Sequence, residues 1–146
     1  MKKADHAASV LKEGFNCAQA VFSTCAPGLA LKEDTAAKIA SSFGGGMARG
    51  GGTCGAVTGA LMALGLKYGS SRPRDKEIKE KSYEIAREFM RRFTERNGST
   101  VCRDLLGCDI STHEGHERAK QQGLFDTVCV KLVKDSVEIL EDMLSK

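Results

Sequence analysis

Six cysteines are the residues of this 146-residue chain with the most specific chemistry, because a thiolate can act as a nucleophile, a redox group or a metal ligand. None of them belongs to a C-x-x-C pair, which excludes the thioredoxin motif, the zinc ribbon and the common ferredoxin patterns. A site shared by several of them must therefore be assembled by the fold. The six are Cys17, Cys25, Cys54, Cys102, Cys108 and Cys129.

Cys54 has the strongest local argument for reactivity. Thr53 is a natural N-cap, which predicts a helix with Cys54 in its first turn. Free backbone N–H groups and the helix dipole stabilise a thiolate at that position. We therefore expect Cys54 to have a lowered pKa and to act as a nucleophile or a ligand.

Helical periodicity separates the other cysteines. Cys25 lies at the centre of the apolar stripe of the first expected helix and is predicted to be a core residue. Cys17 lies on the shoulder of that stripe, where a thiol can face an internal cleft. Cys102 and Cys129 lie on apolar faces, and burial alone explains each of them as well as a site does.

A glycine tract precedes Cys54, since eight of the 16 glycines fall between Gly44 and Gly59. Glycine adopts backbone conformations that other residues avoid, so the N–H groups of this tract can form a concave anion site beside the Cys54 sulfur; a flexible linker is the alternative. No predicted strand precedes its G-x-G-x-x-G spacing, which excludes a dinucleotide-binding fold. The residues predicted to bind a cofactor or an anion are Arg49, Gly50, Gly51, Gly52 and Thr53.

A second group of metal-ligating residue types, Cys108 with His113 and His116, falls in a polar stretch. Its His-Glu-Gly-His spacing is not the H-E-x-x-H of zinc proteases. Ser111 and Glu114 have capping-box spacing, so we favour a polar surface helix over a metal site here.

The elements that must position these residues are helices. Apolar residues recur at three- and four-residue steps and no segment alternates with period two, which predicts an all-α fold. We expect a compact bundle of about five to six helices, in which a central buried helix follows the glycine-rich loop. The predicted helices run from about Ala7 to Cys25, from Asp34 to Phe43, from Cys54 to about Lys67, from Arg74 to Asn97, onward from Ser111, and from about Phe125 to Leu144, with a short helical turn from Cys102 to Leu106.

The long helix carries many charges outside its apolar stripe. Glu77 with Lys81, and Glu88 with Arg92, have the favourable i,i+4 order of an ordinary solvated helix, so we favour a solvated face over a docking surface. The stripe predicted to be buried consists of Ile78, Ile85, Ala86, Phe89 and Phe93.

Composition limits the class of protein. With 41% hydrophobic and 28% charged residues, residues 1–146 are expected to form one domain. A net charge of +3 and the absence of Trp argue against a nucleic-acid partner. The longest apolar run has 13 residues and the N-terminus has no signal-like stretch, so we predict a cytoplasmic protein without membrane insertion and leave a homodimer open. A reducing cytoplasm leaves metal binding, redox chemistry or burial as roles for the thiols.

Three motifs resemble one known family: Asn16-Cys17-Ala18-Gln19, Thr53-Cys54-Gly55-Ala56-Val57-Thr58-Gly59, and Cys102-Arg103-Asp104-Leu105-Leu106-Gly107, with Cys129 near the C-terminus. Over about residues 10 to 135 the chain resembles the C_GCAxxG_C_C family, whose members are described as redox-active. Where the family label writes glycine before cysteine, this chain reads Cys-Gly-Ala-x-x-Gly. The resemblance implies four signature cysteines, Cys17, Cys54, Cys102 and Cys129, and leaves Cys25 and Cys108 outside.

The resemblance also extends to a module of multihaem split-Soret cytochromes, which implies an iron–sulfur or haem-linked role, although the chain has no C-x-x-C-H for haem attachment. We therefore predict a cysteine-based redox protein. It would act as an oxidoreductase or as an electron-transfer protein with an unidentified redox partner. The four signature cysteines would form a dithiol/disulfide couple or hold an iron–sulfur cluster or metal ion. The alternative is a non-catalytic helical protein that binds zinc or a small anion at the same place.

Overall fold

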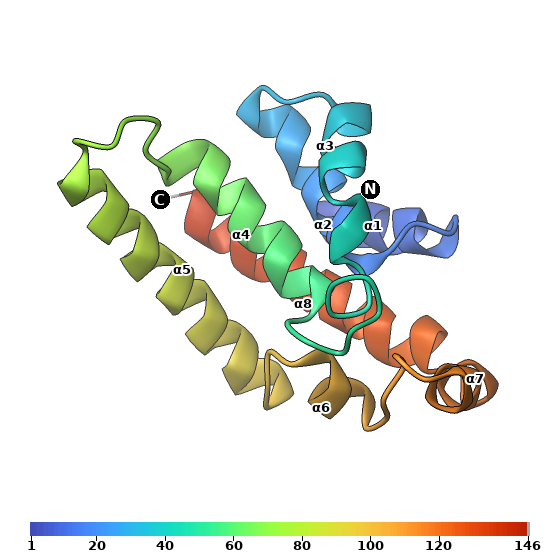
Figure 1. The fold of residues 1–146 in the computed structure, drawn as a ribbon. Helices are drawn as coiled ribbons and strands as arrows, with labels where there is room; N and C mark the ends of the chain where they lie inside the picture. The colour runs from blue at the N-terminus through green and yellow to red at the C-terminus, as the bar shows by residue number, and fades with distance from the viewer. Residues whose placement is uncertain (146) are drawn as a thin grey trace.

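The computed structural model describes residues 1–145 of the chain. Within them the fold is all-helical, as predicted, and its only strand-like feature is an isolated antiparallel bridge between Thr53 and Val101 (Figure 1). The described part contains eight α-helices and two 3-10 helices. They are α1 (Lys3–Lys12), α2 (Cys17–Cys25), η1 (Ala26–Leu29), α3 (Glu33–Ile39), η2 (Ser41–Phe43), α4 (Gly55–Tyr68), α5 (Lys76–Asn97), α6 (Cys102–Leu106), α7 (His113–Gln121) and α8 (Leu124–Leu144).

The prediction of about five to six helices is too low, chiefly because the first predicted helix is two helices. Gly14 has a φ of +115°, which ends α1 and redirects the chain. Asn16 then starts α2 with a capping box: its side chain accepts from the N–H of Gln19, and the Gln19 side chain accepts from the N–H of Asn16. Cys17 is therefore the first residue of a helix, whereas the sequence analysis placed it mid-helix.

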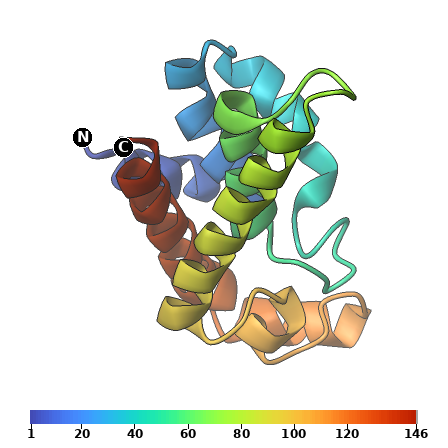
Figure 2. The same ribbon diagram turned by 90° about the vertical axis from the view of Figure 1, so that its left-hand side faces the viewer.

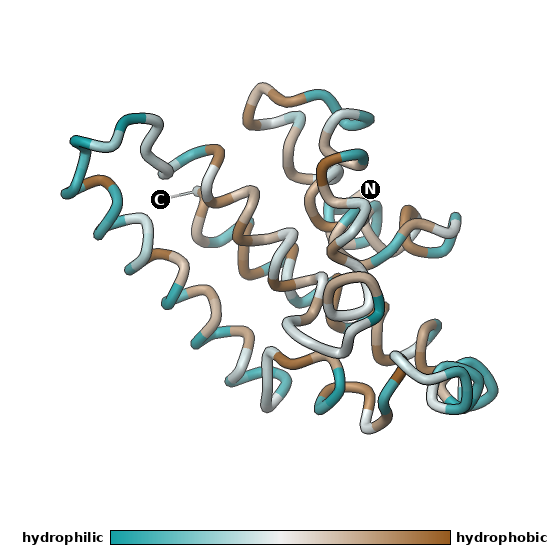
Figure 3. Tube along the Cα trace, in the orientation of Figure 1, coloured by the Kyte–Doolittle hydropathy of each residue, from teal (hydrophilic) through white to brown (hydrophobic). Residues whose placement is uncertain are grey.

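α4 is the central helix, and it packs against α2, α5 and α8 (Figure 1). Two of its glycines let the α2 backbone come close. A Cβ on Gly55 would lie 2.8 Å from the Ala18 nitrogen, and one on Gly59 would lie 2.7 Å from the Ala18 oxygen. On its other side the buried hydroxyl of Ser136 donates to the carbonyl of Ala56 at 2.8 Å. The residues of α4 are mostly neutral to hydrophobic, as a central helix requires, whereas those of α7 are hydrophilic (Figure 3).

α5 and α8 run antiparallel along one side of the bundle, with α6 and α7 at one end of it (Figure 2). Phe89 and Phe93 anchor α5 in the core, as predicted, and Gly98, with a φ of +86°, ends it. The N-terminal part of α5 lies farther from the core, so the predicted burial of Ile78 is wrong: this side chain is 44% exposed.

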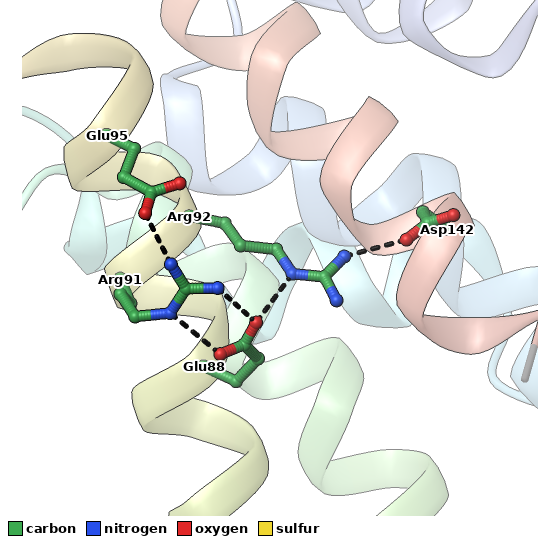
Figure 4. Close-up of polar contacts among 5 residues, drawn as sticks. All are labelled: Glu88, Arg91, Arg92, Glu95 and Asp142. Atoms are coloured by element: carbon green, nitrogen blue, oxygen red, sulfur yellow. Dashed lines mark hydrogen bonds and ion pairs between the residues drawn. The ribbon is translucent and has the colours of Figure 1, made fainter.

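The charged face of α5 is a network that also reaches α8 (Figure 4). Arg92 pairs with Glu88, as predicted, at 2.8 Å and with Asp142 of α8 at 2.7 Å. The predicted partner of Lys81 is wrong, because Lys81 pairs with Glu84 at 3.4 Å. These pairs are exposed or half-buried, so each contributes little to stability.

Two predicted helix starts shift. α3 begins at Glu33, and the Asp34 side chain lies inside the first turn, where it accepts from the N–H of Thr35. α7 begins at His113, after Thr112, whose hydroxyl accepts from the N–H of Gly115. Caps depend on single side-chain rotamers, so neighbouring Ser, Thr and Asp residues compete for them.

None of the helices in residues 1–145 combines the length and the apolar character that a bilayer span requires.

Candidate functional site

One cavity brings the four signature cysteines together. It has a volume of about 620 Å³, and Cys17, Cys54, Cys102 and Cys129 all line it. Each comes from a different part of the fold: Cys17 begins α2, Cys54 immediately precedes α4, Cys102 begins α6, and Cys129 lies in the second turn of α8. Their sulfurs share a low-dielectric environment, and all six cysteines of the chain are free thiols here.

The second half of the glycine tract holds Cys54 and Cys102 side by side. The Cys102 N–H donates to the carbonyl of Gly52 at 2.7 Å, and the Cys54 N–H donates to the carbonyl of Thr100 at 2.8 Å. These two bonds flank the bridge between Thr53 and Val101. Residues 52–54 and 100–102, far apart in the sequence, are thereby joined as a short backbone clamp.

The first half of the tract is a left-handed turn. Every residue from Gly45 to Arg49 has a positive φ, including the non-glycine residues Met47, Ala48 and Arg49 at +70°, +49° and +64°. Three consecutive non-glycine residues in this region are costly, and such strain persists only where surrounding contacts enforce it. Gly46 shows the reason for the tight coil: a Cβ there would lie 2.4 Å from the Gly52 nitrogen and 2.9 Å from the Cys102 Cβ.

The residues predicted to bind a cofactor or an anion are only partly at the cavity. Arg49 lines it, together with Gly44, Gly45 and Ala48. Gly50, Gly51, Gly52 and Thr53 are not among the lining residues, because their backbone turns away to hold α6. Before Cys54, the tract thus lines the cavity with residues of its first half and not with the predicted segment 50–53.

Burial reverses the predicted ionisation of Cys54. The helix begins at Gly55, so Cys54 is the cap residue rather than part of the first turn. Its side chain is 3% exposed, and burial raises the pKa of Cys54 to about 12, although the N–H groups of Ala56 and Val57 act in the opposite direction. The prediction of a low-pKa Cys54 thiolate is therefore wrong.

The lowered pKa that was expected of Cys54 belongs to another cysteine of the cavity, Cys129, which interacts with Cys17. Cys17 donates a hydrogen bond to the sulfur of Cys129, and this bond, reinforced by burial and by the neighbouring cysteines, raises the pKa of Cys17 well above its usual value. The same bond lowers the pKa of Cys129, against the effect of burial. Burial also raises the pKa of Cys102 to about 11.

The two cysteines outside the signature differ from each other. Cys25 is 3% exposed in the main core, where burial raises its pKa to about 11, so its prediction as a core residue is confirmed. Cys108 is half-buried beside α6 and is not a lining residue of the cavity.

Sequence reasoning missed several polar and aromatic residues of the cavity wall. His116 was expected on a surface helix, yet it lines the cavity and packs against Phe125 with ring centroids 5.3 Å apart. Lys12 and Asp126 line it as well. The spacing of α7 offers no local signal for this placement, since it depends on how α7 lies against α8.

A single metal ion does not fit the arrangement. Among residues 1–145, no three His, Cys, Asp or Glu side chains are grouped so as to hold one ion. This includes the Cys108, His113 and His116 set, for which a surface helix was already favoured. The donor chemistry of the four cavity thiols nevertheless suits an iron–sulfur cluster.

Comparison with known proteins gives one finding. Residues 15–143 match the family model described as "Putative redox-active protein (C_GCAxxG_C_C)". Neither the curated proteins nor the solved structures include a significant match to the chain.

Proposed function

The chain belongs to the C_GCAxxG_C_C family, and from that membership we propose that it is a dithiol redox protein in which Cys17 and Cys129 form a reversible disulfide. The observation that carries this proposal is that both thiols line one cavity, where they interact closely enough that the pKa of Cys17 is raised and that of Cys129 is lowered. A disulfide between them forms when the two sulfurs approach to about 2.05 Å. The whole of residues 1–146 would act as one domain.

The chemistry follows from the different ionisation of the two thiols. Cys129, with the lowered pKa, is the attacking thiolate. It attacks a sulfur of a disulfide presented to it, forms a mixed disulfide and releases one thiolate. Cys17 then loses its proton, attacks the Cys129 sulfur and releases the second thiolate. The protein is oxidised by two electrons, which reduce the incoming disulfide to two thiols.

The surroundings support this use of the pair. Cys17 is half-buried and Cys129 is 7% exposed, so water has limited access to an intermediate. Lys12 and Arg49 give the cavity wall two cationic side chains against the single carboxylate of Asp126, a balance that favours an anionic substrate. In a reducing cytoplasm the pair would return to the dithiol state between turnovers.

An iron–sulfur cluster is the second candidate, favoured by the fact that all four signature cysteines line the same cavity. Cys17, Cys54, Cys102 and Cys129 would be its thiolate ligands, and the cluster would supply one-electron transfer. The dithiol reading takes precedence because no three ligating side chains of residues 1–145 are grouped around one point. The same observation weakens the alternative of a structural zinc ion.

The test uses the full chain purified without oxygen. Protein is equilibrated in glutathione buffers of graded potential, quenched with acid, alkylated and mapped by peptide mass spectrometry. We expect Cys17 and Cys129 to link as a two-electron couple, and this link to be lost in Cys17→Ser and Cys129→Ser. Cys25→Ser is the matched control, since its buried thiol lies outside the cavity and the variant should keep the linked pair.

Iron, zinc and acid-labile sulfide are measured on the same preparation. Stoichiometric iron and sulfide, lost in a serine variant of any of the four cavity cysteines, would replace the dithiol proposal by the cluster. A preparation without metal, in which Cys17 and Cys129 remain unlinked at every potential, would contradict both redox mechanisms and leave anion binding.

A further inference from the structure

Cys108 lies outside the signature, but it follows a sharp turn at the end of the helix that begins with a signature cysteine. α6 ends at Leu106, and Gly107 follows in the left-handed conformation with φ +71° and ψ +16°. Its N–H donates to the carbonyl of Arg103 at 2.9 Å. A helix end of this kind reverses the chain, and the residue after the glycine commonly contacts the helix it has just left. Here the residue after the glycine is Cys108, and the first residue of the short helix is Cys102.

Packing agrees with the turn. Cys102 belongs to a small buried cluster with Leu106, Ile110, Ala119 and Cys129, and the half-buried Cys108 packs against this cluster. Cys108 is also one of the thiols whose charge adds to the effect of burial on Cys102, after that of Cys129. Cys102 therefore lies near both Cys108 and Cys129.

The three thiols differ in solvent exposure. Cys102 and Cys129 are each 7% exposed, whereas Cys108 is half-buried. Cys102 lines the cavity and Cys108 does not, so Cys108 lies outside the cavity, just beyond the end of α6. A large disulfide-bearing molecule meets Cys108 more readily than it meets Cys102 or Cys129, the attacking thiol of the inner pair.

We propose that Cys108 and Cys102 form a second, outer dithiol that passes disulfides between an external thiol or disulfide and the inner pair. This deepens the proposed function and rests on it only for the inner half. The external reactant is a disulfide, such as glutathione disulfide or a protein disulfide.

Each step is a thiol–disulfide exchange that balances. The Cys108 thiolate attacks the external disulfide and releases one thiolate, and Cys102, losing its proton, attacks Cys108 and releases the second. Cys129 then attacks the Cys102 sulfur and expels the Cys108 thiolate. Finally Cys17, losing its proton, attacks Cys129 and expels the Cys102 thiolate. The outer dithiol is regenerated, the inner disulfide is formed, and two electrons have passed to the external disulfide.

The experiment follows oxidation of the reduced full chain by glutathione disulfide, with acid quenching, alkylation and peptide mapping over time. In the wild type we expect glutathione first on Cys108, then a Cys102–Cys108 disulfide, then the inner disulfide. In Cys108→Ser, the inner disulfide should form at least about ten-fold more slowly than in the wild type. The redox midpoint of the Cys17–Cys129 couple at equilibrium should stay unchanged. Cys25→Ser controls for the loss of a thiol, and circular dichroism checks that each variant is folded.

The outcomes separate the two proposals. An inner disulfide that forms at the wild-type rate in Cys108→Ser overturns the relay and leaves the proposed function intact. Cys108 that becomes glutathionylated in the wild type but never links to Cys102 overturns it as well. A Cys102–Cys108 disulfide that forms while Cys17 and Cys129 never link supports the outer dithiol and contradicts the proposed function.

Discussion

Gly59 is the point where the central helix comes closest to α2, so Gly59→Ala tests the packing that places Cys17 beside the cavity. The added Cβ would lie 2.7 Å from the Ala18 oxygen and 3.2 Å from the Ala18 Cα, whereas ordinary contact begins at 3.4 Å. The two backbones must therefore separate by roughly 0.7 Å, and overpacking of this kind costs about 1–3 kcal/mol.

Gly65 provides a matched control on the same helix. It is exposed, and a Cβ added to it would meet nothing within 4 Å. Replacing glycine by alanine inside a helix stabilises it by about 1 kcal/mol at either position. We therefore expect Gly65→Ala to raise the free energy of unfolding by about 1 kcal/mol. The free energy of unfolding of Gly59→Ala should be lower than that of Gly65→Ala by about 1–3 kcal/mol.

The assay is urea denaturation followed by circular dichroism, with thermal melting as a second measure, where 1 kcal/mol corresponds to about 2–4 °C for a chain of this size. Oxidation of the inner pair is measured on both variants, because a shifted α2 moves Cys17 as well. Equal stabilisation by the two substitutions would refute the reasoning, since it would mean that α2 and α4 are not in close backbone contact at Gly59.

Three further predictions concern a core hydroxyl, a surface carboxylate and a buried thiol. Ser136→Ala removes the hydroxyl that donates to the Ala56 carbonyl, so urea denaturation should show a loss of about 0.5–1.5 kcal/mol, and unchanged stability would contradict the bond. Two arginines lower the Glu88 pKa from its ordinary 4.5 to about 2; the charged form therefore stabilises the fold above pH 4.5, and the difference in melting temperature between wild type and Glu88→Gln should fade as the pH drops toward 2. A difference that stays constant over that range would argue against the pairing. Since burial raises the pKa of Cys54 to about 12, its alkylation by iodoacetamide in the reduced native protein should be slow at pH 8 and keep rising above pH 11, and rapid reaction at pH 8 would show that Cys54 is a thiolate after all.

Most helices could be predicted from local patterns. α4, α6 and α8 begin and end within a residue or two of the predicted bounds, and α5 begins two residues late, because apolar periodicity and glycine stops are properties of neighbouring residues. The break before Cys17 had a local signal as well, since Asn16-x-x-Gln19 has capping-box spacing. A continuous apolar stripe across the break concealed it.

The candidate site was predictable in its members but not in its chemistry. Cysteine identity and the family resemblance singled out Cys17, Cys54, Cys102 and Cys129, and all four line one cavity. Nothing local indicated that Cys17 and Cys129, 112 positions apart by number, would be the hydrogen-bonded pair. Nothing local indicated either that Gly44 and Gly45 would face the cavity while Gly51 and Gly52 hold α6.

The sequence by itself determined that the chain is helical, that a buried helix follows a glycine tract, and that its cysteines are the candidate site residues, because these depend on residue type and spacing along the chain. Only the tertiary structure decided which thiol ionises more easily. The N–H groups that favour a Cys54 thiolate come from the next residues in the sequence, whereas the burial that raises its pKa comes from everything packed around it. For Cys129 the balance is opposite, since a hydrogen bond from Cys17 on another helix outweighs burial.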